Sequence, residues 1–411
     1  MLDDRTQAPF PIEEVRARFP ALRAGATVFL DNASGAQLPD AVIAAVTDAM
    51  TRLQVNKGGR YAASREVTEA KERVRSRTAD FLGACGDEAG VAFGPNATTL
   101  SFLLAEAVGG TLASGDEVVI TGLDHHANRD PWRRLERLGV RVRSWTPRGP
   151  ETLLEPNELD ELLSDATRVV AVTGASNLLG SYVPLEEIGA RLADHPARLV
   201  VDAVHLAPHR LPDVRAWGAD AVLFSPYKVV APHLGVLWIK GDWRAALPDW
   251  GLSFLPPGPL RWEPGTQNHE AILGFGAALD HLAWLGHRTG AASDAGERAA
   301  WTAGYAAAEA HERGLLARLL SGLDALGATR YGRPGVEGRT ATVAFTMPGR
   351  SPLEIADAVG ARGVAVAAGH AYAETLAREH LGLTDGAVRA SLLHYSAVSD
   401  VDALLEALAE G

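Results

Sequence analysis

The chain has little of several features that other classes of protein require, and each shortage excludes a class. Cys85 is the only cysteine among 411 residues, so neither an intramolecular disulfide nor a metal cage of cysteine ligands can form. No run approaches the ~20 apolar residues of a membrane span. No stretch is strongly basic and the net charge is −12, which argues against a nucleic-acid surface. The acidic N-terminus lacks an apolar segment of signal-peptide length, so we expect a cytoplasmic protein that binds neither membrane nor nucleic acid.

What the chain does contain is the pattern of an α/β protein, in a length that favours two domains. Hydrophobic residues make up 47% and charged residues 22%, as in ordinary soluble proteins. Short apolar runs alternate with amphipathic stretches, which predicts a doubly wound, mostly parallel sheet with helices on both faces. The predicted strands are Val91–Phe93, Glu117–Thr121, Arg141–Trp145, Arg168–Thr173, Arg198–Asp202, Ala221–Ser225 and Leu234–Ile239. The predicted helices between them are Ala97–Val108, Pro184–Ala193 and Leu211–Trp217.

A different pattern follows the proline-rich segment at residues 256–259. Residues 270–326 contain no proline and are rich in Ala, Leu, Glu and Arg, which predicts long helices. The remaining predicted elements are strands Thr340–Thr346, Val364–Ala367 and Val388–Leu393 and helices Pro352–Ala361 and Val401–Glu410. We therefore predict a large domain over residues 24–290 and a smaller α+β domain made of residues 1–23 and 291–411.

Lys228 and Asp202 each follow an apolar run directly. If the two runs are neighbouring parallel strands, the acid and the amine meet at one carboxyl edge of the sheet, where open α/β folds bind ligands. An aldehyde cofactor with a pyridine nitrogen requires this pair, a lysine for the aldehyde and a carboxylate for the ring nitrogen. Each residue alone has a simpler explanation, since a lysine can extend to the surface and an aspartate can cap a helix. Together they predict a site for pyridoxal 5'-phosphate (PLP).

Other polar side chains also follow predicted strands. Asn96 to Thr99 open a helix, where free N–H groups and hydroxyls suit a phosphate, although an ordinary helix cap explains the same residues. Asn177 is placed to donate to a ring oxygen, or to make a turn with Gly180. His125 and His126 suggest zinc, but adjacent side chains diverge and no matching acid-and-histidine motif is present. We therefore predict no metal, a ring-stacking role for His125 and a structural role for His126.

These segments, in order along the chain, resemble the class V aminotransferase group of fold-type I PLP-dependent enzymes, in its cysteine desulfurase-like branch. The matching segments are Leu30-Asp31-Asn32-Ala33, Gly94-Pro95-Asn96-Ala97-Thr98-Thr99, Asp124-His125-His126-Ala127-Asn128, Ala175-Ser176-Asn177, Val201-Asp202-Ala203-Val204-His205, Ser225-Pro226-Tyr227-Lys228, Glu263-Pro264-Gly265-Thr266-Gln267-Asn268 and Val388-Arg389-Ala390-Ser391. The resemblance implies PLP as cofactor and a homodimer with an active site shared between subunits.

The resemblance also implies a role for each matching residue. Lys228, His125 and Asp202 are the catalytic residues that it implies, as Schiff-base lysine, ring-stacking residue and partner of the pyridinium nitrogen. The cofactor contacts that it implies are Ala97, Thr98, Ser225 and Tyr227 at the phosphate, Thr266 reaching the phosphate from the other subunit, Asn177 and His205 at the phenolic oxygen, and Ala203 on the second ring face. Arg389 would pair with the substrate carboxylate, a role that suits its planar fork.

The chain departs from cysteine desulfurases at the residue that takes up sulfur. Desulfurases present a mobile cysteine in a loop before the arginine segment, and Tyr372 stands at about that place here. A tyrosine cannot replace a thiolate as the sulfur acceptor. Cys85 precedes the first strand of the large domain, where we expect a small structural cysteine. These residues argue against a persulfide-forming cysteine desulfurase.

Four hypotheses about the function follow, three of them reactions. The first is β-elimination from an S-substituted cysteine, as in the carbon–sulfur lyases that this branch resembles, with release of a thiol, pyruvate and ammonia. The second is decarboxylation coupled to oxidative deamination of the same conjugate, which leaves an aldehyde. The third is transamination or epimerisation, and the fourth is a non-catalytic regulator that keeps the fold. The candidate substrate-pocket residues, beside Arg389, are Ala33, Ser34, Arg60, Tyr61, Trp262, His370 and Tyr372.

Overall fold

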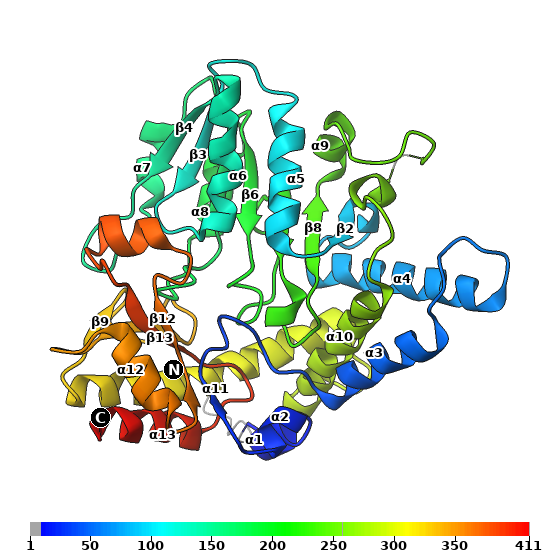
Figure 1. Cartoon of the computed structure of the whole chain (residues 1–411). Coiled ribbons are helices and arrows are strands. Elements are labelled where there is room, and N and C mark those ends of the chain that lie inside the picture. Colours follow the sequence, from blue (N-terminus) through cyan, green and yellow to red (C-terminus); the bar gives the residue numbers. More distant parts are fainter. Residues whose placement is uncertain (1–9, 257, 411) are drawn as a thin grey trace.

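The centre of the molecule is a seven-stranded sheet (Figure 1), and the computed structural model describes residues 10–256 and 258–410. The strands stand in the order β2-β8-β7-β6-β5-β3-β4, with β8 antiparallel to both neighbours and the other pairs parallel. Their bounds are β2 Val91–Gly94, β3 Glu117–Thr121, β4 Arg141–Trp145, β5 Thr167–Thr173, β6 Arg198–Asp202, β7 Ala221–Phe224 and β8 Gly235–Ile239. The prediction of a doubly wound, mostly parallel sheet is confirmed.

Helices cover both faces of this sheet because the strands are apolar on both sides. In β7, Val222 and Phe224 belong to one buried cluster, whereas Ala221 and Leu223 belong to the other. This alternation is the period of two that a strand imposes on its side chains. On the face of Ala221 lie α5 Ala97–Gly109, α6 Asp130–Arg133 and α9 Gly241–Ala246. On the face of Val222 lie α3 Asp40–Arg52, α4 Ala62–Phe81, α7 Pro156–Leu162, α8 Leu185–Leu192, α10 His269–Thr289 and the first half of α11 Glu297–Ala325.

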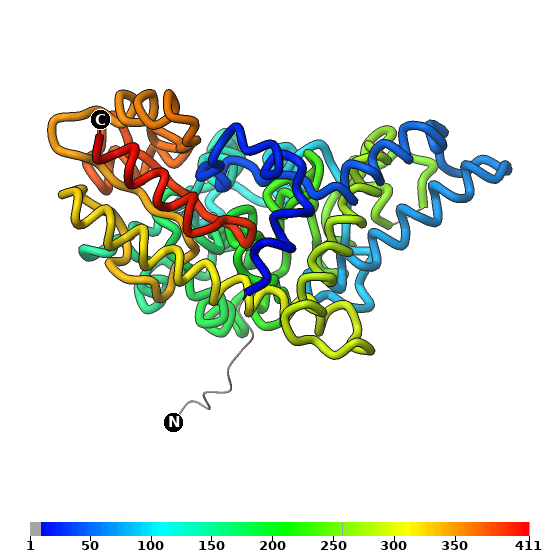
Figure 2. Tube along the Cα trace, turned by 90° about the horizontal axis from the view of Figure 1, so that it is seen from below, coloured from blue at the N-terminus to red at the C-terminus, as the bar shows by residue number. Residues whose placement is uncertain are grey.

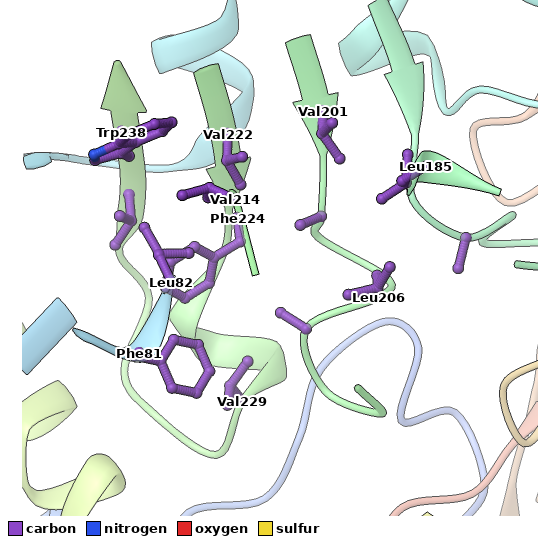
Figure 3. Close-up of a cluster of buried hydrophobic side chains, with 14 of the residues drawn as sticks. Phe81, Leu82, Leu185, Val201, Leu206, Val214, Val222, Phe224, Val229 and Trp238 are labelled. Carbon is purple, nitrogen blue, oxygen red and sulfur yellow. The ribbon is translucent and has the colours of Figure 1, made fainter. Parts of the chain in front are cut away.

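The segment after β7 rests on a part of this core that Figure 3 shows in close-up. Phe224 and Val229, on either side of the turn at residues 225–228, are fully or almost fully buried. The Phe224 ring lies 5.7 Å from the ring of Phe81, at the end of α4. Aromatic packing of this kind fixes the turn in place, and with it the side chain of Lys228.

A second, smaller unit contains a four-stranded sheet in the order β12-β13-β10-β9. Its elements are β9 Thr329–Tyr331, β10 Thr342–Thr346, α12 Pro352–Gly360, β12 Ala367–Gly369, β13 Ala387–Ser391 and α13 Val398–Ala409. The pair β1 Val28–Phe29 and β11 Val364–Ala365 lies beside it, and the short helices α1 Ile12–Arg16 and α2 Pro20–Arg23 begin the described chain. Figure 2 shows α13 lying along the second half of α11, which supplies a buried row of leucines to this unit.

Two predicted elements differ from the structure. Residues Leu211–Trp217 form turns and not a helix, because Pro212 lacks an N–H and the carboxylate of Asp213 accepts the N–H groups of the next residues. The predicted strand Val364–Ala367 is divided between β11 and β12, which pair in different sheets. None of the described helices is long and apolar enough to cross a membrane.

Candidate active site

Lys228 and Asp202 lie together at the carboxyl edge of the large sheet. Strands β6 and β7 pair in parallel with Asp202 opposite Leu223, and Lys228 ends the 3-10 turn Pro226–Lys228 that follows β7. Both side chains line a cavity, here called the inner cavity, together with Thr98, Asn177, His205 and Ser225. An outer cavity adjoins it, lined by Ser34, His370, Tyr372 and Arg389, and both cavities share His125, Asn177, Tyr227 and Lys228.

Burial sets the charge state of this pair. Lys228 is only 7% exposed, and burial, reinforced by the charge of Arg389, lowers the pKa of its amine to about 8. Burial also raises the pKa of Asp202, opposed by the N–H of Val204, which donates to its carboxylate at 2.8 Å, and by the charge of Lys228. The amine therefore loses its proton far more easily than an exposed lysine does.

The start of α5 forms one wall of the inner cavity. The Asn96 side chain caps this helix by accepting the N–H of Thr99 at 2.7 Å, and Ala97 and Thr98 line the cavity. Gly235 of β8 is needed beside this turn, because a Cβ there would lie 2.3 Å from the Asn96 carbonyl carbon. The free N–H groups at a helix start favour an anion, as the sequence predicted for a phosphate.

His125 lies where the two cavities meet, and its imidazole is neutral. Burial, with the charge of Lys228, lowers the pKa of this ring to about 3. Its Nδ1 accepts the N–H of Ala127 at 2.9 Å, which leaves the proton on Nε2. A neutral, fixed ring suits stacking better than proton transfer. The side chain of His126 is turned away, toward Asp130 and Thr375, and its backbone N–H donates to Tyr372 at 2.8 Å.

The loop at the mouth of the outer cavity is held in an unusual conformation. Ala371 and Tyr372 both have positive φ, at 49° and 57°, which non-glycine residues rarely adopt. The buried amide of Asn177 donates to the Ala371 carbonyl at 2.7 Å and so holds the loop. The Tyr372 ring is 71% exposed and lies 5.3 Å from the ring of His125. Asn177 therefore has one amide proton committed to this loop.

Arg389 lies buried at the base of the outer cavity. Its guanidinium donates to the Asp31 carboxylate at 2.8 Å, to the Ser34 hydroxyl at 2.7 Å and to the Asn177 carbonyl at 3.0 Å. Its Nε has no hydrogen-bond partner among the described residues. Asp31 thus neutralises and orients a buried arginine that still has a donor available.

One cofactor prediction shifts by a residue. Ala203 is fully buried in the core and does not line the inner cavity, whereas its neighbour Val204 does. Successive side chains point to opposite sides, so a one-residue offset decides which of them faces the cavity. We therefore move the ring-packing prediction from Ala203 to Val204. His205 does line the inner cavity, and its Nδ1 has no hydrogen-bond partner in the part of the chain that the structure describes.

Several candidate residues are not brought to the cavities of this chain. Thr266 is exposed and lines neither cavity. Arg60 and Tyr61 are exposed at the loop between α3 and α4, which projects at one end of the molecule (Figures 1 and 2). Trp262 packs in the core cluster on the α5 face and is not a pocket residue. Cys85 is exposed and lines neither cavity, so the expectation of a packed cysteine is wrong.

The structure adds site residues that the sequence did not indicate. They are Asp31, which pairs with Arg389, Ser101 and Val204, which line the inner cavity, and Thr340 and Thr342, whose hydroxyls contact His205. Asp31 lies in a segment that the sequence had singled out, but its partner is far away in the chain. No local pattern identifies the two threonines, which lie at the start of a strand in the smaller unit.

The unpaired polar atoms of the inner cavity fit the predicted cofactor. Ser101 Oγ, Asn177 Oδ1 and His205 Nδ1 are all buried without a hydrogen-bond partner among the described residues. Buried polar groups without partners are rare and costly, so an inner cavity with three of them suits a polar ligand. A pyridine aldehyde with a phosphate would meet an amine at Lys228, a carboxylate at Asp202 and the start of α5 for its phosphate.

Comparisons with known proteins place the chain beside aminotransferase-like proteins and cysteine desulfurases. The family model described as aminotransferase class-V matches residues 28–404. The chain is 33% identical to an aminotransferase-like protein of Gibberella zeae (FGM3), over 98% of this chain and 99% of the relative. It is 32% identical to a cysteine desulfurase of an Enterobacter species, over 97% of this chain and 98% of the relative.

Solved structures resemble the fold closely. An apo cysteine desulfurase of Thermococcus onnurineus has a TM-score of 0.87 and 26% identity, with 98% of each chain covered. The cysteine desulfurase CsdA of Escherichia coli has a TM-score of 0.84 and 27% identity, again with 98% of each chain covered.

Proposed function

The chain belongs to the class V aminotransferase family, and from this premise we propose that it cleaves the carbon–sulfur bond of a cysteine S-conjugate by β-elimination. Enzymes of this family and cysteine desulfurases depend on PLP, so the chain is a PLP-dependent enzyme. Members act on amino acids and are typically dimers. The finer assignment, to a carbon–sulfur lyase, depends on the loop at the outer cavity.

The observation that carries the proposal is the absence of a thiol at this loop. Tyr372 stands where the resemblance places the sulfur-accepting cysteine, and its side chain is exposed at the mouth of the outer cavity. Cys85, the one cysteine of the chain, lines neither cavity. Without a thiolate, a persulfide cannot form on the protein. A site that keeps Lys228, Asp202 and Arg389 but has no thiol favours release of the sulfur on the leaving group.

The residues of the chain divide the work as follows. PLP, when bound, supplies the electron sink that makes the bonds at the substrate Cα labile. The buried Asp202 would hold the proton on the pyridine nitrogen of the bound cofactor. Lys228 would hold the cofactor through its aldehyde and, once free, its amine would move the Cα proton. Its low pKa matters here because the neutral amine acts as a base at a pH where an exposed lysine is protonated.

The outer cavity binds and orients the amino acid. The free Nε of Arg389 is available to the substrate carboxylate, beside the hydroxyl of Ser34. Neutral His125, which lines both cavities, would stack on the cofactor ring and exclude water from that face. His370 and Tyr372 lie at the mouth, where they contact the S-substituent. Arg60 and Tyr61, on their projecting loop, are proposed to reach the outer cavity of the partner subunit.

The reaction consumes one water. The Cα–H and Cβ–S bonds break, the proton and sulfur leave as a thiol, and hydrolysis of the remaining three-carbon unit gives pyruvate and ammonium. The test is a panel of S-substituted cysteines incubated with the purified holoenzyme, with thiol, pyruvate and carbon dioxide measured in air and without oxygen. We expect thiol and pyruvate in equal amounts, independent of oxygen and without carbon dioxide. Oxygen-dependent release of carbon dioxide would contradict elimination and support decarboxylative deamination to an aldehyde.

Lys228→Ala separates an enzyme from a non-catalytic member of the fold. The variant should lose its bound chromophore and at least about 100-fold of its activity, because the same amine binds the aldehyde and transfers the proton. Lys240→Ala, at an exposed lysine just after β8, is the matched control and should behave as the parent. Activity and colour that both survive Lys228→Ala would exclude the assignment. The cytoplasmic location expected from the sequence stays a prediction.

A further inference from the structure

His205 lies between the inner cavity and two threonines of the smaller unit. It is 2% exposed, and its Nε2 lies 3.2 Å from the Thr340 hydroxyl and 3.1 Å from the Thr342 hydroxyl. Both hydroxyls are buried, at the start of β10. The other ring nitrogen, Nδ1, is buried and has no partner among the described residues, and the side chain lines the inner cavity. One nitrogen is therefore held by protein and the other is available to a ligand.

The hydrogen count decides which nitrogen carries the proton. Each threonine hydroxyl has one hydrogen to donate, and neither makes another hydrogen bond as donor within the described structure. If Nε2 carried the ring proton, both hydroxyl hydrogens would lie buried without an acceptor. If Nε2 carries a lone pair, the two hydroxyls share it as their acceptor, so fewer buried donors lack a partner than in the Nε2–H form. Because an unmade buried hydrogen bond costs about 1–3 kcal/mol, the second arrangement is favoured.

We propose that Thr340 and Thr342 hold His205 as the Nδ1–H tautomer, so that Nδ1 donates a hydrogen bond to the phenolic oxygen of the bound cofactor. The same proton placement gives the buried hydroxyls an acceptor and the orphaned Nδ1 a partner. The two threonines act as positioning residues, since neither lines the inner or the outer cavity. The proposal uses the PLP dependence of the chain and does not depend on carbon–sulfur cleavage.

The charges around His205 keep it in the neutral form on which this choice depends. Burial holds the pKa of the ring well below its ordinary value, and the charges of His209, Lys228 and Arg389 act in the same direction. His209 is itself bonded through Nδ1 to Glu312 at 2.7 Å, and the His205 and His209 ring centroids lie 5.5 Å apart. With a single proton on the ring, its position alone determines whether the group facing the inner cavity donates or accepts.

The direct test is the tautomer in solution. The protein labelled with ¹⁵N-histidine is studied as apoenzyme by long-range ¹H–¹⁵N correlation, with His205→Gln to assign the signal. We expect a protonated Nδ1 and an unprotonated Nε2 in the parent. The double variant Thr340→Val/Thr342→Val should shift the population toward Nε2–H, the form that imidazole prefers in water. Thr340→Ser/Thr342→Ser should restore Nδ1–H, since serine keeps the hydroxyls.

A control and a second readout make the test decisive. Thr346→Val, at the other end of β10, bonds to Tyr331 and not to His205, and should leave the tautomer unchanged. In the holoenzyme, a donor at the phenolic oxygen favours the deprotonated chromophore. His205→Leu should therefore move the midpoint of the pH-dependent absorbance change up by about one pH unit, whereas His205→Gln keeps a donor and should not. An Nε2–H signal in the parent, or an unchanged midpoint in His205→Leu, would overturn the proposal.

Discussion

At the scale of the residue, the site keeps a charge where the fold would be more stable without one. Lys228 is buried near Asp202, whose own pKa burial raises, and no ion pair within contact distance joins the two in the described structure. An amine in this position is less stable as a cation than it is in water, which is the physical meaning of a lowered pKa. The same property makes it a base under ordinary conditions. Activity and stability therefore oppose each other at this side chain.

Replacing Lys228 with methionine should stabilise the apoenzyme. The pKa falls from 10.5 to about 8 in the folded chain, so between these values the unfolded chain binds more protons and wild-type stability rises with pH. Below pH 8 the amine is charged in both states and the cost of burial is fully present. We expect Lys228→Met to raise the free energy of unfolding at pH 7 by up to about 3 kcal/mol.

The gain should shrink as the pH rises through the interval, and loss of the cation beside Asp202 will reduce it further. Chemical denaturation of the cofactor-free protein at pH 7 and pH 10 measures both values. Lys240→Met, at an exposed lysine, should show no such difference. If the Lys228→Met apoenzyme is less stable than the parent at pH 7, burial of the charged amine does not destabilise the fold.

Sequence position predicted some of these residues and not others, for a physical reason. Asp202 ends strand β6 and Lys228 ends the turn after β7, and the geometry of a parallel sheet brings such ends together. The contact between Arg389 and Asp31 joins residues 358 positions apart, and only the packing of the smaller unit creates it. The exchange of Ala203 for Val204 reflects a single step along the chain, which reverses the direction of a side chain but leaves the pattern of residue types almost unchanged.

At the scale of the element, backbone strain is concentrated around the site. Of the described non-glycine residues, Thr152, Val230, Ala371 and Tyr372 have positive φ, and three of these four lie near Lys228 or in the loop over it. Such conformations cost about 1–3 kcal/mol each and persist where surrounding contacts enforce them. Asn177 and the backbone N–H of His126 enforce the loop conformation. These contacts hold the loop in the conformation that places Tyr372 at the mouth of the outer cavity.

Tyr372→Gly tests this interpretation of the loop. Glycine adopts positive φ without strain, so the variant should fold at least as stably as the parent, within about 1 kcal/mol. For a cysteine conjugate with a large aromatic S-substituent, we expect KM to rise about tenfold, because the contact between the Tyr372 ring and the substituent is lost. For S-methylcysteine, which has no such ring, KM should stay nearly unchanged. Tyr372→Phe keeps the ring and should retain the parent KM for both. Equal changes for both substrates would show that the ring does not contact the S-substituent.

The strands of the large sheet were predictable because each is apolar on both faces, and such runs have few other uses in a soluble chain. The turns at Leu211–Trp217 were not, because their apolar residues occur at helical spacing while the backbone is directed by Pro212 and Asp213. The loop at residues 370–373 carried no local signal for its strained form. Its conformation is set by a side chain almost two hundred residues earlier, at Asn177.

At the scale of the whole molecule, the site lacks residues that the family resemblance supplies from a second subunit. Thr266 is exposed and lines neither cavity, and the loop that carries Arg60 and Tyr61 projects away from the body of the chain (Figure 1). Exposed residues of this kind are explained if a second copy buries them. A symmetric dimer would place each Thr266 at the phosphate end of the other subunit's inner cavity.

Mixed dimers distinguish this arrangement from one in which each subunit is complete. Lys228→Ala removes the amine, and Thr266→Asp places a negative charge against the phosphate, so each homodimer should be inactive. A heterodimer purified through two different affinity tags contains one subunit of each variant. If Thr266 acts across the interface, one of its two sites is intact, because that site combines Lys228 from one subunit with Thr266 from the other. We expect it to recover about half of the parent activity per dimer.

The opposite arrangement has an equally definite result. If Thr266 serves its own subunit, one site of the heterodimer lacks the amine and the other carries the added charge, so no activity returns. Thr289→Asp, at the end of α10, is the matched control for an added charge and should leave its homodimer active. Recovery in the heterodimer would show that Thr266 completes the inner cavity of the other subunit, which explains why this exposed residue lines neither cavity of its own chain.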